Sequence, residues 1–230
     1  MKKMDLLLDL KSNGVRTVVI CGEQGIGKTT IAVEVFKRIA HKFDACAFIS
    51  NIRQVFKNDK IYLRKCLYQA LLDSEDCTRN DDDMTLDKFM KRLEFKRVLI
   101  VLDDVDRFEQ IEGLVGNWRK EGQVLGEGSR VVVTSKENYL WTRYGRENIY
   151  EVDKLTKDEA LQLLCEKAFE ENRMLDEYIE MSNNFIEYAD GNTSTLKNLG
   201  SFLFGRTVDE WSNTIAKLKV NPTFSKQYNI

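Results

Sequence analysis

A glycine-rich turn constrains the fold of this chain more than any other feature of its sequence. The turn reads Gly22-Glu23-Gln24-Gly25-Ile26-Gly27-Lys28-Thr29, after an apolar run and before residues with helical spacing. The pattern G-x-x-x-x-G-K-[ST] between a strand and a helix predicts a phosphate-binding loop. Glycines let the backbone turn so that N–H groups point at an anion, and the helix N-terminus favours the same charge. We therefore expect an α/β protein built around this turn.

Each position of the turn has a predicted role. Lys28 would bring a full positive charge to the β- and γ-phosphates, and Thr29 would offer its hydroxyl to Mg²⁺. A chance glycine-rich turn is the alternative, but the strand before it and the helix after it argue against chance. We predict a site for ADP or ATP with Mg²⁺. The predicted nucleotide-binding residues here are Gly22, Gly25, Ile26, Gly27, Lys28, Thr29 and Thr30.

Five short apolar runs predict strands. They are Thr17–Cys21, Ala45–Ile49, Val98–Leu102, Val131–Val133 and Ile149–Val152. Strands that are apolar on every side are covered on both faces, which is typical of a parallel sheet with helices around it. Segments with helical spacing lie between these runs, so the pattern predicts an α/β domain with a five-stranded parallel sheet.

Two aspartates follow the most apolar of these runs, as Asp103 and Asp104. Acidic residues at the carboxyl end of a buried strand lie where ligands collect in open α/β sheets. Asp103 would hold Mg²⁺, and Asp104 could act as a general base toward the attacking water. The alternative for Asp104 is a helix cap before residues 105–110, because aspartate is a common cap.

After about residue 154 the sequence changes to helical spacing alone. Thr156 with Glu159 and Thr207 with Glu210 match the capping box at a helix start. Apolar residues at spacings of three and four follow each box. We predict a nucleotide-binding domain over residues 1–154 and a small all-α helical bundle over residues 155–230.

Composition excludes several other classes of protein. There are 35 basic and 37 acidic residues, and the net charge of −2 argues against binding to nucleic acid or to an acidic membrane surface. Five cysteines without a C-x-x-C pair, together with one histidine, argue against a zinc site. No apolar segment reaches the length of a membrane span. We expect a soluble protein of the cytoplasm or the nucleus.

Four ordered segments resemble the NB-ARC domain of plant nucleotide-binding, leucine-rich-repeat immune receptors. They are GEQGIGKTT, KRVLIVLDDVDRFEQIEGL, GSRVVVTSKE and IYEVDKLTKDEALQLLCEKAF, and DDVD is similar to the class with a TIR domain. The resemblance extends from about Met4 to Ser225. It implies a P-loop NTPase of the STAND type, with sheet order 2-3-4-1-5, that holds ADP when off and ATP when on and hydrolyses slowly. It also implies that the bundle is the first ARC helical subdomain and closes over the nucleotide.

Three departures from the family pattern bear on hydrolysis. Lys136 stands where the family usually has arginine, so a charge for sensing the γ-phosphate remains without the bidentate fork. Thr193, within GNTSTL, stands where the family's GLPLAL has a proline that touches the nucleotide. Gln24 replaces a glycine. Two functions therefore stay open, a switch with slow hydrolysis and an NTPase-like interaction module without hydrolysis.

The resemblance also implies partners. In the family, TIR, winged-helix and leucine-rich-repeat domains accompany the NB-ARC domain. We therefore expect this chain to act with such domains or with other receptor chains, either as a segment of a longer receptor or as a short gene product.

Overall fold

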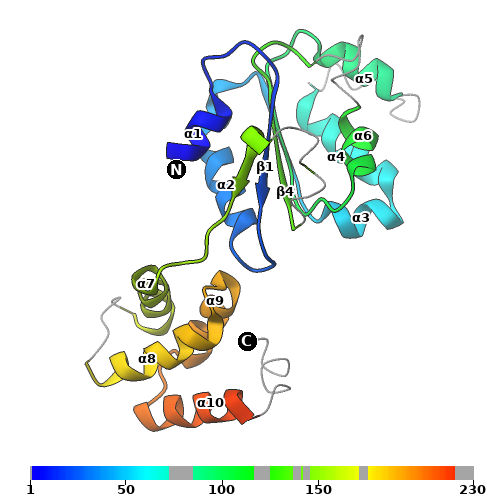
Figure 1. Cartoon of the computed structure of the whole chain (residues 1–230). Coiled ribbons are helices and arrows are strands. Elements are labelled where there is room, and N and C mark those ends of the chain that lie inside the picture. Colours follow the sequence, from blue (N-terminus) through cyan, green and yellow to red (C-terminus); the bar gives the residue numbers. More distant parts are fainter. Residues whose placement is uncertain are drawn as a thin grey trace. The chain divides into compact units, whose positions relative to one another are not determined.

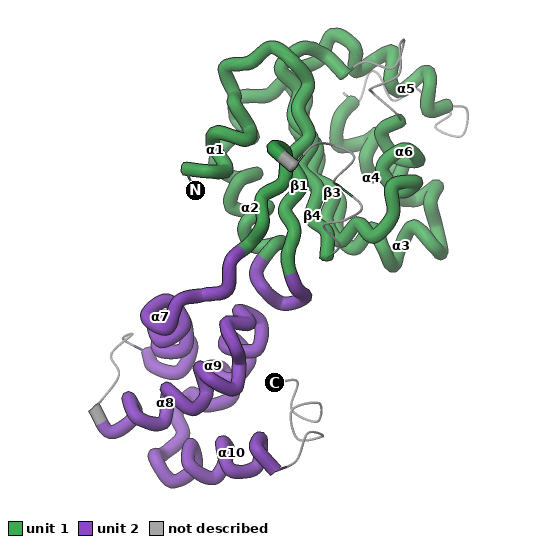
Figure 2. Tube along the Cα trace, viewed as in Figure 1, with its two compact units in different colours: residues 1–22, 28–152 green, residues 23–27, 153–230 purple. Residues whose placement is uncertain are grey.

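The computed structural model describes residues 2–72, 85–116, 125–136, 141, 146–170 and 176–220. Their contacts divide the chain into two compact units, coloured separately in Figure 2. The α/β unit comprises Met1–Gly22 and Lys28–Val152, and the helical unit comprises Glu23–Gly27 and Asp153–Ile230. The centre of the glycine-rich turn is thus grouped with the helices that follow it much later in the sequence.

A five-stranded parallel sheet forms the centre of the α/β unit (Figure 1). Its strands are β1 (Arg16–Cys21), β2 (Ala45–Ile49), β3 (Val98–Leu102), β4 (Arg130–Ser135) and β5 (Ile149–Glu151). Their order is β2-β3-β4-β1-β5, and the four pairings are all parallel. The predicted fold class and strand order are therefore confirmed. Strand β1 lies between β4 and β5, so the turn that follows β1 starts from the interior of the sheet.

Both faces of the sheet are buried, as the apolar runs predict. Along β1, Val18 and Ile20 pack on one side with α1 (Lys2–Leu8) and α2 (Lys28–Ile39). Val19 and Cys21 point to the other side, since successive strand residues alternate. The other face is covered by α3 (Ile52–Asn58), α4 (Lys60–Leu71), α5 (Leu86–Leu93) and α6 (Phe108–Val115).

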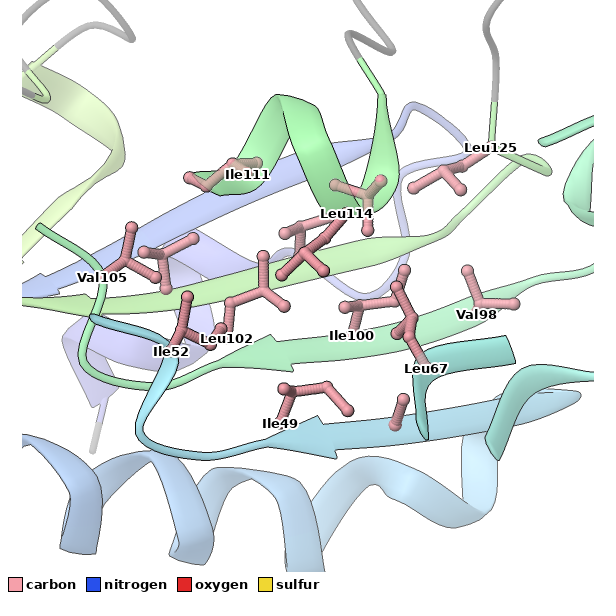
Figure 3. Close-up of a cluster of buried hydrophobic side chains, with 14 of the residues drawn as sticks. Ile49, Ile52, Leu67, Val98, Ile100, Leu102, Val105, Ile111, Leu114 and Leu125 are labelled. Atoms are coloured by element: carbon pink, nitrogen blue, oxygen red, sulfur yellow. The ribbon is translucent and has the colours of Figure 1, made fainter. Parts of the chain in front are cut away.

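The two faces of the sheet each carry a cluster of buried apolar side chains. Figure 3 shows the larger cluster. Side chains from β2, β3, α4 and α6 meet over the sheet, and the labelled Ile100, Leu67 and Leu114 are fully buried. Burying one such side chain contributes roughly 1.5–3 kcal/mol. Strand β3 ends at Leu102, within this packed layer, and the two aspartates follow it directly.

Helices α1, α3 and α6 are less evident in the sequence than the strands are. Helix α6 begins at Phe108, with Arg107 at its N-cap, and therefore not directly after Asp104. The alternative prediction of Asp104 as a cap for a helix over residues 105–110 is wrong. Val105 instead continues the buried core and donates its backbone N–H to the carbonyl of Thr134.

Four helices form the rest of the helical unit. They are α7 (Lys157–Ala168), α8 (Asp176–Ala189), α9 (Thr193–Leu203) and α10 (Val208–Val220). Thr156 caps α7 in a complete capping box, and the same reciprocal bonds join Thr207 and Glu210 ahead of α10. The core gathers around Trp211, whose ring lies 4.9 Å from that of Tyr178 and 5.5 Å from that of Phe185.

Candidate functional site

The glycine-rich turn follows β1 directly and ends where α2 begins at Lys28. Gly25 and Gly27 have φ values of 80° and 107°, a region that side chains with a Cβ rarely adopt. The Lys28 Nζ donates to the carbonyl oxygen of Gly22 at 2.9 Å, so its ammonium group folds back over the turn. The local sequence therefore produces the turn expected of a phosphate-binding loop, which we call the phosphate loop (Gly22–Thr29).

Lys28 lies among other charged groups. Burial lowers the pKa of Lys28 below its usual range, and the charges of Asp104 and Asp103 oppose that shift. The charge of Lys136 acts in the same direction as burial. The four charges predicted from separate parts of the sequence therefore interact electrostatically at the end of the sheet. A group with several negative charges placed there would relieve the repulsion between the two lysines.

Asp103 is held by two threonine hydroxyls. Thr29 Oγ1 donates to Asp103 Oδ1 at 2.8 Å, and Thr134 Oγ1 donates to the same oxygen at 2.7 Å. Only 4% of Asp103 is exposed, so its carboxylate is fixed by these bonds. Strands β3 and β4 pair with Leu102 opposite Val133, and this register brings Asp103 and Thr134 together just beyond.

The chemistry of Thr29 and Asp103 fits Mg²⁺. Magnesium prefers hard oxygen donors and usually binds through one or two protein groups, with water and phosphate oxygens as its other ligands. A hydroxyl and a carboxylate oxygen 2.8 Å apart match that description. Within the described ranges there is no group of three or more histidine, cysteine or acidic side chains that could hold a metal by themselves. The donor set therefore suits a magnesium ion that arrives with a nucleotide.

Asp104 has an unusual backbone and a charged partner. Its φ of 58° is left-handed, and its N–H donates to Thr134 Oγ1 at 2.9 Å. Its Oδ2 lies 3.2 Å from Arg53 Nε, and its carbonyl accepts from the Arg53 N–H at 2.9 Å. Side chain and backbone of Arg53, from the start of α3, thus both hold Asp104. In this arrangement the Asp104 carboxylate forms an ion pair.

The centre of the phosphate loop is hydrogen-bonded within the helical unit, to the start of α9. Asn192 Nδ2 donates to the Gln24 carbonyl at 2.8 Å, and Thr193 Oγ1 donates to the Ile26 carbonyl at 3.0 Å. Between them, the Ser194 N–H donates to the Gly25 carbonyl at 2.9 Å. The structure thus places Thr193 against the loop backbone, and its contact with a nucleotide stays a prediction.

Two other predicted site residues are exposed. Lys136 follows β4 directly, and Thr30 lies in the first turn of α2. Cys21, in contrast, is 1% exposed, and burial together with the charge of Glu151 raises the pKa of its thiol to about 12. Cys21 is therefore a thiol at neutral pH and belongs to the core.

Three residues with contacts at the site are not evident from the sequence. Thr134 lies in the segment GSRVVVTSKE, but its bond to Asp103 depends on the register of β3 and β4. Arg53 follows β2 as Asp104 follows β3, and the two strands are neighbours. The only sequence signal for Asn192 is its resemblance to a helix cap, a role that it fills for α9.

A family model described as the NB-ARC domain matches residues 2–174. Over 227 residues the chain is 34% identical to disease resistance protein RPV1 of Vitis rotundifolia, and over 230 residues it is 32% identical to TMV resistance protein N of Nicotiana glutinosa. Each alignment covers 96% of this chain, but 16% of RPV1 and 19% of N. The chain therefore spans less than a fifth of either relative.

Two solved structures share the architecture at low sequence identity. Cdc6p from Pyrobaculum aerophilum matches with a TM-score of 0.61 and 13% identity, covering 93% of this chain and 61% of that one. Drosophila ORC bound to DNA matches with a TM-score of 0.61 and 17% identity, covering 95% and 65%. At these identities the likeness shows the fold alone. Among the helices of the described residues, none has the length and hydrophobicity needed to cross a lipid bilayer.

Proposed function

Because this chain belongs to the NB-ARC domain family, we propose that it is the nucleotide-binding switch module of a plant disease-resistance receptor. Its ligand is ADP or ATP with Mg²⁺. The observation that carries the proposal is the combination of a glycine turn closed by Lys28 with Asp103 bonded to Thr29. Its partners are the other domains of such a receptor, or other receptor chains, because curated relatives are several times longer than this chain.

Each residue has a role in this proposal. Backbone N–H groups of the phosphate loop bind phosphate oxygens, and Lys28 neutralises their charge. A bound Mg²⁺ would supply positive charge to the phosphate groups. Thr29 and Asp103 would hold the ion, and Thr134 keeps the Asp103 carboxylate in place. Lys136 provides a second cation for the γ-phosphate.

We propose that hydrolysis by this chain is slow. A general base must be free to accept a proton from the attacking water. One oxygen of the Asp104 carboxylate pairs with Arg53 at 3.2 Å, which restrains how the group can meet that water. Lys136 adds a point charge and cannot form the bidentate contact of an arginine. These two observations also favour the second candidate function, a module that binds nucleotide for interaction with partners and does not hydrolyse it.

Calorimetric titration with MgADP and MgATP tests the proposed ligand. Replacing Lys28 removes a charge-assisted contact of roughly 1.5–3 kcal/mol. Lys28→Ala should therefore lower the affinity for both nucleotides at least about tenfold, since 1.4 kcal/mol corresponds to a factor of ten. Lys37→Ala removes an exposed lysine from the same helix, α2, and should leave both affinities unchanged. Equal affinities for the parent and Lys28→Ala would contradict the proposal.

Multiple-turnover hydrolysis with saturating MgATP separates the two candidate functions. Slow phosphate release that disappears in Asp104→Ala supports the switch with hydrolysis, whereas no release above the Lys28→Ala background supports the interaction module. If Lys136 limits the rate, Lys136→Arg should raise it. Turnover in the range of about 1–100 per second, which is common for phosphoryl-transfer enzymes, would overturn the proposal of slow hydrolysis.

A further inference from the structure

The carbonyl groups of the phosphate loop have partners of their own. Three successive carbonyls, those of Gln24, Gly25 and Ile26, accept hydrogen bonds from the first residues of α9. Two of the three donors are side chains, from Asn192 and Thr193, at 2.8 and 3.0 Å. We call these three bonds the loop–α9 contact. It lies wholly within the helical unit, to which Glu23–Gly27 belong.

The loop–α9 contact orients the N–H groups of the loop. A trans peptide unit is planar, with its N–H and C=O pointing in opposite directions, and the described residues contain no cis peptide bond. Turning the carbonyls of residues 24–26 toward α9 therefore turns the N–H groups of Gly25, Ile26 and Gly27 away from it. One of them, on Ile26, makes only a long 3.4 Å turn contact with the Glu23 carbonyl. The loop–α9 contact thus turns these three N–H groups to the side of the loop that faces away from α9.

The surroundings of Gly25 show how closely the phosphate loop approaches the start of α9. A Cβ at this position would come within 3.0 Å of the Asn192 side-chain amide, and the φ of 80° disfavours a side chain as well. The Asn192 side chain is also bonded to its own helix. As the N-cap of α9, its Oδ1 accepts from the Thr195 N–H at 3.0 Å. The amide group that contacts the loop is therefore fixed to the helix.

We infer that Asn192 and Thr193 are positioning residues that hold the phosphate loop in its nucleotide-binding form through its carbonyl groups. Neither side chain needs to touch the nucleotide in this role. The inference rests on the proposed function, because its consequence is a change in nucleotide affinity. A proline at position 193 could not form this contact, because proline has no side-chain donor to replace the Thr193 hydroxyl.

The contact also couples α9 to the ligand. If an ordered α9 favours the binding form of the loop, bound nucleotide must favour an ordered α9 to the same extent, because binding linkage is reciprocal. MgADP should therefore slow exchange of the Ser194 N–H, which donates to Gly25.

Substitutions at the two positions can separate the contact from helix stability. Asn192→Asp keeps an oxygen to cap α9 but replaces the donor to Gln24 with a charged acceptor. Thr193→Val removes the hydroxyl with little change of shape, and Thr193→Ser keeps it. Loss of one hydrogen bond corresponds to roughly 0.5–1.5 kcal/mol, so the two disruptive variants should each weaken MgADP binding about 2- to 10-fold. Thr193→Ser should bind like the parent.

The test uses the full chain with two measurements, calorimetric titration of MgADP and hydrogen exchange of the Ser194 N–H. Exchange of the Ser194 N–H without nucleotide should be faster in Asn192→Asp and Thr193→Val, because this N–H is the backbone donor of the loop–α9 contact. The melting temperature of the chain should be kept in Asn192→Asp. If the parent binds MgADP and the disruptive variants bind equally well, the inference is wrong. If the parent does not bind MgADP, the proposed function fails, and unchanged exchange of the Ser194 N–H in the variants would then overturn the positioning role separately.

Discussion

The α/β unit buries charged side chains among its apolar residues, whereas the described part of the helical unit buries none. Asp103, Gln110 and Arg130 are nearly inaccessible in the α/β unit. In the helical unit the buried polar residues are Ser182 and Thr214, and each hydroxyl donates to the carbonyl four residues earlier. The first unit thus orients charges, and the second packs apolar helices.

The difference shows where buried charges find hydrogen-bond partners. A buried charge is costly unless it is hydrogen-bonded, so a fold keeps one only where the partners are in place. In the α/β unit those partners are at the carboxyl ends of β3 and β4 and at the N-terminal segment. Within the helical unit, residues at the start of α9 donate to the carbonyls of Gln24, Gly25 and Ile26.

The largest expected effect is on the core of the helical unit. Trp211 is fully buried, contacts three other aromatic rings and donates its Nε1–H to the Leu203 carbonyl. Trp211→Ala should cost about 3–5 kcal/mol of unfolding free energy. Denaturant unfolding followed by segment-resolved hydrogen exchange should show the loss in α7–α10 and not in the sheet. Phe204→Ala, at a residue that is 49% exposed, is the matched control. Equal losses in both units would remove the distinction between them.

Arg130 allows the corresponding test in the α/β unit. Its guanidinium is fully buried and donates to five backbone carbonyls, those of Leu8, Asp9, Ser12, Gly14 and Ser129. Burial lowers the pKa of Arg130 to about 10, so it stays charged at neutral pH, and its stability contribution should not vary between pH 6 and 8.

Arg130→Met leaves those carbonyls without a donor and should cost at least about 3 kcal/mol, measured by chemical unfolding. Arg16→Met, whose partly exposed side chain pairs with Asp9 at 2.8 Å, should cost less than about 1 kcal/mol. If the two variants lose the same stability, the buried guanidinium is not what anchors the N-terminal segment.

A smaller effect concerns the metal. If Asp103 and Thr29 hold Mg²⁺, ATP should bind about tenfold more tightly with Mg²⁺ than with EDTA, and ADP should depend on the ion less. Asp103→Asn should remove most of that difference, while Asp158→Asn, at an exposed residue of α7, should keep it. If EDTA leaves the ATP affinity of the parent unchanged, Asp103 and Thr29 are not ligands of a magnesium ion that supports ATP binding.

The smallest effect is a pH dependence of the helical unit. The backbone N–H of Thr156 donates to Glu159 at 2.8 Å and lowers the pKa of that carboxyl below its ordinary 4.5, and Thr207 does the same for Glu210. Because the folded-state pKa is lowered, this stabilisation is present above pH 4.5 and is lost as pH falls through the folded value.

Thermal unfolding of the full chain at pH 7 and pH 3.5 measures this dependence. The double variant Glu159→Gln, Glu210→Gln keeps an oxygen acceptor at each cap but cannot titrate, so its melting temperature should fall less between the two pH values. A decrease as large as that of the parent would mean that other groups cause the acid sensitivity.

Much of the fold can be predicted from residue types and their spacing. A strand buried on both faces must be apolar along its whole length, so runs such as Val98–Leu102 identify the parallel sheet. The capping boxes at Thr156 and Thr207 work through bonds three residues apart, which spacing alone reveals. The phosphate loop is equally local, because its glycines and Lys28 act on the turn that contains them.

Contacts between segments that are far apart in the sequence could not be predicted in this way. Thr134 meets Asp103, and Arg53 meets Asp104, because the register of neighbouring strands brings their ends together. Asn192 reaches Gln24 across 168 positions of sequence. A side chain's hydrogen-bonding capacity can be known from its type, but its partner depends on which backbone groups packing brings within about 3 Å. Only the tertiary structure settles that choice, since burial of the apolar faces places these elements together and the polar groups at their ends must then find partners there.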